Sequence, residues 1–155
     1  MTTIHNESFA DLEPETLYAL LRLRVDVFVV EQRAAYPELD GRDLEPGTRH
    51  IWVTAGDPTR PLSYLRLLAE PDGTMRIGRV VTAKEARGAG LAKRLVLAAL
   101  EVDPSAPTVL DAQSHLVGFY GALGFTPVGP EYVDEDGIPH VPMRRPAATG
   151  AARRS

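Results

Sequence analysis

Apolar positions along the chain follow two spacings, one typical of helices and one of strands. Pro14 suits the first turn of a helix, and an apolar repeat at helical spacing runs from there to Val29. Residues 50–54, 62–69 and 75–82 are rich in β-formers, and short turns with glycine or proline separate them. This pattern predicts an antiparallel meander of three strands. A weaker strand pattern covers residues 4–9.

The second half of the chain alternates between helix and strand patterns. An apolar helix face follows Gly90 and ends before two prolines, and a strand pattern then covers residues 108–112. Because a helix separates strands 75–82 and 108–112, we predict that they are parallel and joined by a right-handed crossover. A short helix over 117–123 and a hairpin of residues 125–133 and 138–143 follow. Together these elements predict a mixed, mostly antiparallel twisted sheet flanked by helices, of class α+β.

Length and composition exclude several kinds of protein. The 155 residues predict one domain over 1–145, and the low apolar content of 146–155 predicts a disordered tail. The chain has no cysteine, which excludes disulfides, thiolate metal ligands and thiol nucleophiles. No apolar run approaches the roughly 18 residues of a membrane span, and no secretory signal pattern is seen. We therefore expect a cytoplasmic protein with no membrane partner.

Charge is unevenly distributed, although the net charge is only −4 and no nucleic-acid partner is expected. Residues 26–45 hold six acids against two bases, 84–94 hold four bases against one acid, and 131–136 hold four acids. This contrast suggests two ligands of opposite sign. Arg24 lies within the apolar stripe of the first helix, where it either extends to solvent or meets a buried acid. The four histidines show no clustered spacing, so no metal site is predicted.

Two glycines mark the start of the second helix, in the segment Arg87-Gly88-Ala89-Gly90-Leu91-Ala92-Lys93. Glycine lets a ligand approach a helix N-terminus closely, and the free N–H groups and helix dipole there attract phosphate. The basic side chains of the segment add positive charge. A phosphate or pyrophosphate site is the functional interpretation, and an ordinary tight turn is the alternative. The spacing matches neither a P-loop nor the dinucleotide fingerprint.

Two motifs carry a resemblance to a known family. Arg87-x-x-Gly90-x-Ala92 resembles the [QR]-x-x-G-x-[GA] motif of the GNAT superfamily of acyl-CoA N-acyltransferases, and FYGALGF at residues 119–125 resembles its F-Y-x-x-x-G-F segment. The order of the two motifs agrees with the predicted elements, and the resemblance covers roughly residues 4–145. LRLRVDVFVVEQ, AQSHLVGFYGALGF and EDGIPHVPM further resemble the ElaA branch of the superfamily. The resemblance implies the GNAT fold.

The resemblance also implies where acetyl-CoA, the cosubstrate, would bind. The pyrophosphate would rest on backbone amides of the loop, and the pantetheine arm would run along the preceding strand. An N–H of Val80 or Val81 would hold the thioester oxygen, although burial in a core strand explains both valines equally well. Gln113 stands where many members have an asparagine that contacts CoA. The implied acetyl-CoA residues are Val80, Val81, Thr82, Arg87, Gly88, Ala89, Gly90, Ala92, Lys93 and Gln113.

Tyr120 is the expected general acid, because a phenol can protonate the CoA thiolate as it leaves. The alternative is a core tyrosine with a structural role. An alkylammonium must lose a proton before it attacks, and His115, His140 and Glu31 are three candidates for the base. Some family members place a glutamate on the strand at 108–112, where Asp111 is the only acid.

The expected activity is therefore acetyl transfer from acetyl-CoA to a primary amine by direct attack in a ternary complex. The alternatives are a non-catalytic acyl-CoA-binding or sensing domain on the same fold, and an acyltransferase for longer acyl chains. The acceptor is a small molecule or a peptide, with polyamines, amino acids, aminoglycosides and protein N-termini left open. The acidic segments 31–45 and 131–136 predict a cationic acceptor. A homodimer is compatible with these expectations.

Overall fold

The computed structural model describes residues 1–148 and gives the following elements. The strands are β1 (Thr3–Glu7), β2 (Arg49–Thr54), β3 (Ser63–Ala69), β4 (Met75–Thr82), β5 (Thr108–Gln113), β6 (Thr126–Pro127), β7 (Tyr132–Val133) and β8 (Pro139–Arg145). The helices are α1 (Pro14–Val25), α2 (Leu91–Leu100) and α3 (Val117–Gly121), and α1 continues into a π-helical segment, Asp26–Glu31. Single 3₁₀ turns cover Phe9–Asp11, Arg42–Leu44, Lys84–Ala86 and Ser114–Leu116.

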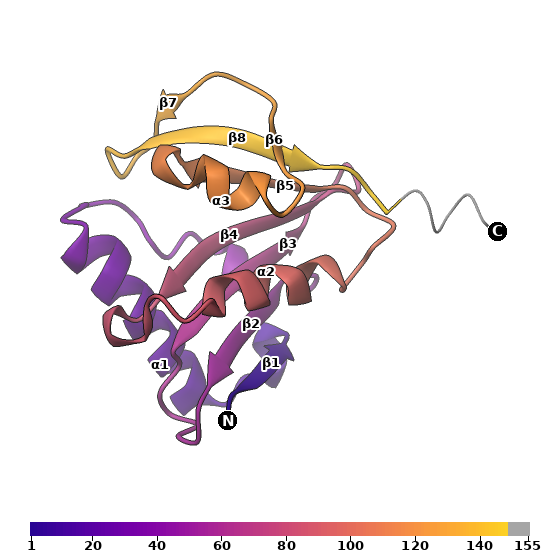
Figure 1. Cartoon of the computed structure of the whole chain (residues 1–155). Coiled ribbons are helices and arrows are strands. Elements are labelled where there is room, and N and C mark those ends of the chain that lie inside the picture. The colour runs from indigo at the N-terminus through magenta and orange to yellow at the C-terminus, as the bar shows by residue number, and fades with distance from the viewer. Residues whose placement is uncertain (149–155) are drawn as a thin grey trace.

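The strands form one mixed sheet in the order β1-β2-β3-β4-β5-β8-β6, and β7 also pairs with β8. The meander of β2, β3 and β4 is antiparallel, and β4 and β5 are parallel. Both predictions are confirmed, as is the predicted mixed sheet flanked by helices. Figure 1 shows α2 connecting β4 to β5 across one face of the sheet. The final hairpin is less regular than predicted, because only residues 126–127 and 132–133 pair with β8.

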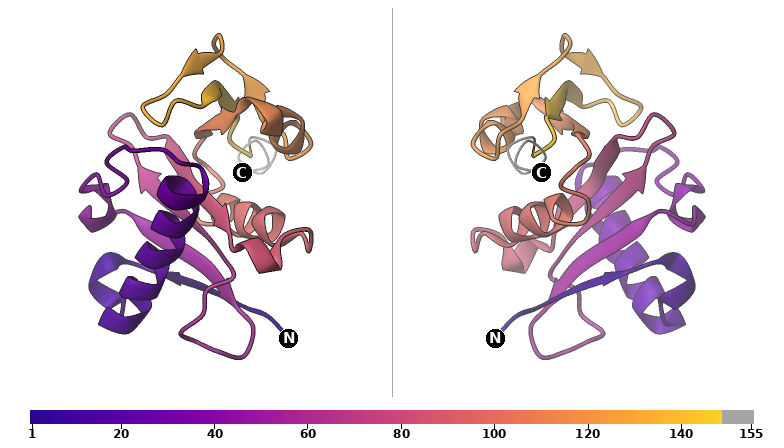
Figure 2. Two further views of the ribbon diagram at one scale, coloured as in Figure 1. Left: turned by 90° about the vertical axis from the view of Figure 1, so that its left-hand side faces the viewer. Right: turned by 90° about the vertical axis from the view of Figure 1, so that its right-hand side faces the viewer.

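Successive side chains of the central strands point to opposite faces of the sheet and so form two apolar cores, one on each face. Ile51, Val53 and Leu65 point to the face that packs against α2, where Leu95 is fully buried. Trp52 and Tyr64, their neighbours in sequence, point to the opposite face and pack against α1. In the two side views of Figure 2, α1 and α2 lie on opposite sides of the sheet. Because both faces are covered, nearly every side chain of β2 and β3 is buried.

Strands β4 and β5 part soon after they begin. Their parallel pairing is limited to Met75 with Thr108 and Arg76 with Val109, yet β4 continues to Thr82 and β5 to Gln113. In Figure 1 the two strands start together on the right and separate towards the left. The backbone of β4 beyond Arg76 therefore has no β5 partner, and the space between the strands is left for side chains and ligands.

A β-bulge adds to this irregularity of β4. Tyr64 pairs with Val81 but Arg66 pairs with Gly78, so Arg79 and Val80 together oppose a single residue of β3. Arg79 has φ of 54°, a left-handed conformation that is rare outside glycine and that clusters at functional sites. The bulge lies in the part of β4 that has no β5 partner.

Residues 146–148 follow β8, and the N–H of Ala148 donates to the carbonyl of Pro104 at 2.9 Å. The remainder of the predicted tail, 149–155, lies outside the described residues. None of the helices within residues 1–148 is long and apolar enough to cross a membrane.

Candidate active site

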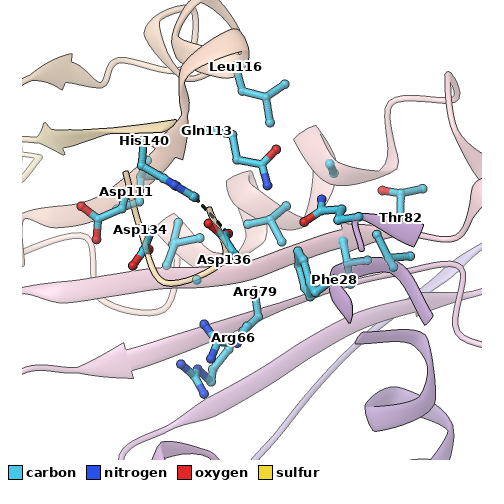
Figure 3. A pocket seen from close by; sticks show the side chains of 18 of the residues that line it. Phe28, Arg66, Arg79, Thr82, Asp111, Gln113, Leu116, Asp134, Asp136 and His140 are labelled. Carbon is cyan, nitrogen blue, oxygen red and sulfur yellow. Dashed lines mark ion pairs between the residues drawn. The ribbon is translucent and has the colours of Figure 1, made fainter. Parts of the chain in front are cut away.

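A cavity of about 710 Å³ lies where β4 and β5 separate. Its walls come from the end of the α1 segment, from β4 and β5, from α3 and from the turn before β8. Figure 3 shows Thr82 at one end and Asp111, Asp134 and His140 at the other. The cavity is lined by all four residues predicted to be catalytic, Glu31, His115, Tyr120 and His140, and by six of those predicted to hold acetyl-CoA, Val80, Val81, Thr82, Arg87, Ala92 and Gln113.

The glycine loop forms an open cradle at the start of α2, next to this cavity. Gly88 and Gly90 have φ of 88° and 74°, and within residues 1–148 nothing lies within 4 Å of a Cβ placed on either one. Gly90 is the N-cap of α2, and among the described residues no side chain caps this end. Gly88, Ala89, Gly90 and Lys93 are all exposed. The N–H groups of the first turn are therefore available to an anion.

Arg87 extends from this loop across the mouth of the cavity to Glu31. Its two Nη atoms lie 2.7 and 2.8 Å from the Glu31 carboxylate, and its Nε donates to the carbonyl of Thr82 at 3.1 Å. The hydrogen bond from Arg87 lowers the pKa of Glu31, which makes this carboxylate a poor base. An anion that binds to the loop competes with Glu31 for the guanidinium.

Tyr120 lies on α3 with its ring buried and its edge in the cavity. The ring packs edge-on against Phe119 and Phe125, with centroids 5.0 and 5.9 Å away. Burial raises the pKa of Tyr120 to about 12. Among the described residues its hydroxyl has no hydrogen-bond partner, so the proton is not committed to a structural contact. The side chain can therefore donate a proton into the cavity.

His140 is the best-placed of the candidate bases. It lies opposite Gln113 in the β5–β8 ladder, and only 7% of the residue is exposed. Its Nδ1 lies 2.7 Å from the carbonyl of Ile138 and must donate to it, so the neutral ring has an unprotonated Nε2. Nε2 lies 3.9 Å from Asp136 Oδ2, too far for a hydrogen bond. Figure 3 shows the His140 ring directed towards Asp136, and both residues line the cavity.

His115, the third candidate, and Asp111, the acid on the strand at 108–112, are less suited to act as a base. His115, on the 3₁₀ turn before α3, is exposed at the rim of the cavity. Asp111, on β5, lies 2.9 Å from Arg76 Nη1 and is engaged in this ion pair. Within residues 1–148 no group of three histidine, aspartate or glutamate side chains could hold a metal ion.

A buried ionic network beneath the cavity was not predicted from the sequence. Arg24 Nε lies 2.8 Å from Glu38, and its Nη1 lies 2.6 Å from Asp43. Arg66 binds Asp40 at 2.8 Å, and Arg79 Nε lies 2.9 Å from Glu38. Tyr36 also donates to Glu38. The loop over residues 36–47 is thus attached to α1, β3 and β4. Of the two alternatives for Arg24, the structure selects the buried acids.

His50, on β2, connects to this network through Asp43 and Tyr64. Its Nε2 donates to the carbonyl of Asp43 at 3.1 Å, so Nδ1 accepts the Tyr64 hydroxyl at 2.6 Å. Burial lowers the pKa of His50, in agreement with a neutral ring. The Arg24 guanidinium lies 5.6 Å from the centroid of the Tyr64 ring.

These ion pairs correct part of the expectation for the acceptor. The acids of segment 31–45 were expected to hold a cation, but Glu31, Glu38, Asp40 and Asp43 each face an arginine. Glu45 is likewise paired, with Arg42. Glu38, Asp40 and Asp43 are thus already paired, whereas Glu31 shares Arg87 with the anion site of the glycine loop. Only the second acidic segment, at 131–136, keeps carboxylates without such partners among the described residues.

Replacing Arg24 with methionine should destabilise the fold by about 3–5 kcal/mol, because Glu38 and Asp43 would remain buried beside a missing charge. Burial favours a raised pKa for Asp43, but the hydrogen bond from Arg24 outweighs it and holds the pKa below its usual value. Urea denaturation measures the loss. Arg22→Met is the matched control: its pair with Asp26 is 3.7 Å long and exposed, so its removal should cost less than about 1 kcal/mol.

The same network predicts that the fold loses stability at acidic pH, and the stability measured against pH is a second test. Despite partial burial, the hydrogen bond from Arg66 lowers the pKa of Asp40 to about 2, from 3.8. A lowered folded-state pKa means that the stabilisation is present above about pH 4 and is lost as the pH falls towards 2. Equal stability of the Arg24→Met and Arg22→Met variants would show that the network does not stabilise the fold.

Comparison with known proteins places this geometry in a family. The family model described as an acetyltransferase (GNAT) domain matches residues 22–146. A UPF0039 protein of Mycobacterium tuberculosis is 49% identical over 140 residues, 89% of each chain. Protein ElaA of Escherichia coli is 41% identical over 142 residues, which cover 88% of this chain and 91% of that protein.

Solved structures give the same result. An acyl-CoA N-acyltransferase from Pseudomonas aeruginosa superimposes with a TM-score of 0.84 and 42% identity, over 94% of this chain and 99% of that chain. The crystal structure of Escherichia coli ElaA superimposes with the same TM-score and coverage and 36% identity in the structural alignment. The fold that the two sequence motifs implied is confirmed.

Proposed function

This chain belongs to the GNAT family of acetyltransferases, and on that premise we propose that it transfers an acetyl group from acetyl-CoA to a primary amine by direct attack. Family and fold support acyl transfer in general. The observation that carries the finer proposal is the cavity next to the glycine loop, which is lined both by a buried acid, Tyr120, and by a buried histidine with a free Nε2, His140.

The residues present fit acyl-CoA. The open cradle at Gly88 and Gly90 accepts a pyrophosphate, and Arg87, Lys93 and the dipole of α2 provide positive charge. The exposed edge of β4 at Val80, Val81 and Thr82 would pair with an amide-bearing arm, and Gln113 would contact it from β5. When bound, acetyl-CoA supplies an acetyl thioester whose carbonyl carbon accepts a nucleophile.

Two different side chains then carry out the proton transfers. His140 Nε2 takes one proton from the acceptor ammonium, directly or through a water. The free amine forms the new C–N bond, and the C–S bond breaks with its electron pair going to sulfur. Tyr120 gives its proton to the sulfur, and the amide nitrogen releases a second proton. One proton leaves overall after Tyr120 is protonated again. A backbone N–H at the bulge of β4, from Val80 or Val81, would stabilise the thioester oxygen.

A non-catalytic acyl-CoA-binding domain on the same fold is the second candidate. It would use the glycine loop in the same way but would not need a proton donor and an acceptor at the far end of the cavity. The uncommitted Tyr120 hydroxyl and the free His140 Nε2 favour the enzyme. Release of free CoA from acetyl-CoA in the presence of an amine separates the two candidates.

Placing glutamate at Gly90 should weaken CoA binding at least tenfold, because a carboxylate would occupy the cradle of the pyrophosphate. Calorimetry with CoA measures the change. Gly90→Gln is the matched control, since it introduces the same length and the same strain at a left-handed position without the charge. We expect Gly90→Gln to bind CoA more tightly than Gly90→Glu.

The binding site would have to lie elsewhere if Gly90→Glu were folded and bound CoA as tightly as the unmutated protein. Circular dichroism and thermal unfolding check the fold of both variants. Because a Cβ at residue 90 meets nothing within 4 Å among residues 1–148, both variants should remain folded.

A further inference from the structure

The charges that line the cavity are not balanced. Four arginines line it, and each is already paired with a carboxylate: Arg66 with Asp40 at 2.8 Å, Arg76 with Asp111 at 2.9 Å, Arg79 with Glu38 at 2.9 Å, and Arg87 with Glu31 at 2.7 Å. Within the described residues, the cavity wall therefore offers no free guanidinium to a carboxylate on the acceptor.

Three further carboxylates line the cavity without a basic partner of this kind. Asp134, Glu135 and Asp136 are consecutive and lie in the turn between β7 and β8. Among residues 1–148, no lysine or arginine forms an ion pair with any of them. One oxygen of Asp134 accepts the N–H of Glu135, and one oxygen of Asp136 accepts the N–H of Ile138, both at 2.8 Å. The turn is thus held by its own backbone and presents its other oxygens.

The contact between His140 and Asp136 is an independent observation that points to a ligand. Both side chains are nearly buried, with 9% and 11% exposed, and His140 Nε2 accepts no hydrogen bond from any described residue. The 3.9 Å between Nε2 and Asp136 Oδ2 is too long for a direct hydrogen bond. It is short enough for one ammonium nitrogen to donate to both atoms. Figure 3 shows the two side chains facing each other at the end of the cavity.

We propose that the acceptor is an alkyl diamine or polyamine without a carboxylate, held by the turn at residues 134–136. This inference rests on the proposed acetyl transfer and names the class of its acceptor. The reacting ammonium lies between Asp136 and His140, and a second cationic group lies against Asp134 and Glu135. When His140 takes the proton, the positive charge moves from the amine to the imidazole beside Asp136, so the local charge remains balanced.

Three amines with a similar short chain test the class: putrescine, butylamine and γ-aminobutyrate. They differ only at the end that does not react, which is an ammonium, a methyl group or a carboxylate. With CoA bound, calorimetry should show putrescine binding about tenfold or more tighter than butylamine, the magnitude of one charge-assisted hydrogen bond, and γ-aminobutyrate weakest. Added salt should reduce the advantage of putrescine, because it screens charges near the surface.

Two variants test the two parts of the site separately. Asp134→Asn should reduce the preference for putrescine over butylamine, because one of the two carboxylates that hold the second ammonium loses its charge. Asp136→Asn should weaken both amines about equally, because it removes the contact to the shared reacting end. In both variants the asparagine oxygen can keep the backbone hydrogen bond of the turn. Asp72→Asn, at a turn carboxylate outside the cavity that accepts the N–H of Thr74, should change neither affinity.

The inference is overturned if putrescine binds no more tightly than butylamine, if γ-aminobutyrate binds best, or if Asp134→Asn leaves the preference for putrescine unchanged. Turnover tests the proposed function separately. Putrescine that binds as expected but releases no CoA from bound acetyl-CoA would contradict the transferase and leave the cation site intact. Turnover with equal affinity for the three amines would support the transferase and contradict the cation site.

Discussion

Replacing Tyr120 with phenylalanine should lower kcat by about 10²- to 10⁴-fold while the Kd for CoA stays unchanged, because only the proton donor is removed. Phenylalanine keeps the ring that packs edge-on against Phe119 and Phe125. The lost hydroxyl has no hydrogen-bond partner among residues 1–148, so the variant should be as stable as the unmutated protein. A single-turnover measurement of CoA release shows whether chemistry limits the rate.

The raised pKa of Tyr120 adds a pH test. Because burial raises it to about 12, the phenol stays protonated through about pH 10, and the rate should not fall in that range through loss of this proton. Tyr18→Phe is the matched control, because Tyr18 lies on α1 outside the cavity and is 70% exposed. Full single-turnover activity in Tyr120→Phe would make this side chain a packing residue and would leave the leaving thiolate without a protein acid.

Replacing His140 with glutamine should lower kcat/KM for an amine by about 10²- to 10⁴-fold, since no group would then take the proton of the ammonium. The expectation depends on the tautomer: the hydrogen bond from Nδ1 to Ile138 leaves the lone pair on Nε2. Glutamine has a similar reach but cannot accept a proton at neutral pH. The pH dependence that the base imposes on kcat/KM should be lost together with the rate.

A separate readout distinguishes a base from a structural residue. His140→Ala opens space beside the cavity, and added imidazole should restore part of the lost rate if the missing function is proton transfer. CoA affinity should remain unchanged in both variants. If His115→Gln causes the large loss and His140→Gln does not, then the exposed histidine on the turn before α3 is the base, and the assignment of His140 is wrong.

Local features of the sequence determined much of the fold. The glycines before α2, the alternation in β2 to β4 and the helical spacing after Pro14 each depend on residues close together in the chain, and backbone preferences act at that range. The parallel arrangement of β4 and β5 followed because a helix separates them. The two motifs similarly identified the family, which the comparisons confirmed.

The π-helical segment after α1 could not be predicted from the spacing of apolar residues. The apolar repeat predicted an ordinary helix to Val29, but the chain widens from Asp26 onwards, and Val27 and Phe28 become the buried residues. A π-turn shifts the face of the helix by one residue, which no period of 3.6 describes. Phe28 and Glu31, both in this segment, line the cavity.

Only the tertiary structure decided which charges are paired and which histidine of the cavity wall is buried, His140 and not His115. Arg24 meets Glu38 and Asp43, and Arg66 meets Asp40, across distances in the chain of 14 to 26 residues. Composition alone gave both acidic segments the same weight, yet the arginines of β3 and β4 neutralise the first and leave the turn at 134–136 unpaired. Sequence determined the residue types and the local backbone, because these depend on near neighbours. Tertiary structure decided the partners, because an ion pair, a buried tautomer and the gap between β4 and β5 exist only once distant segments have packed together.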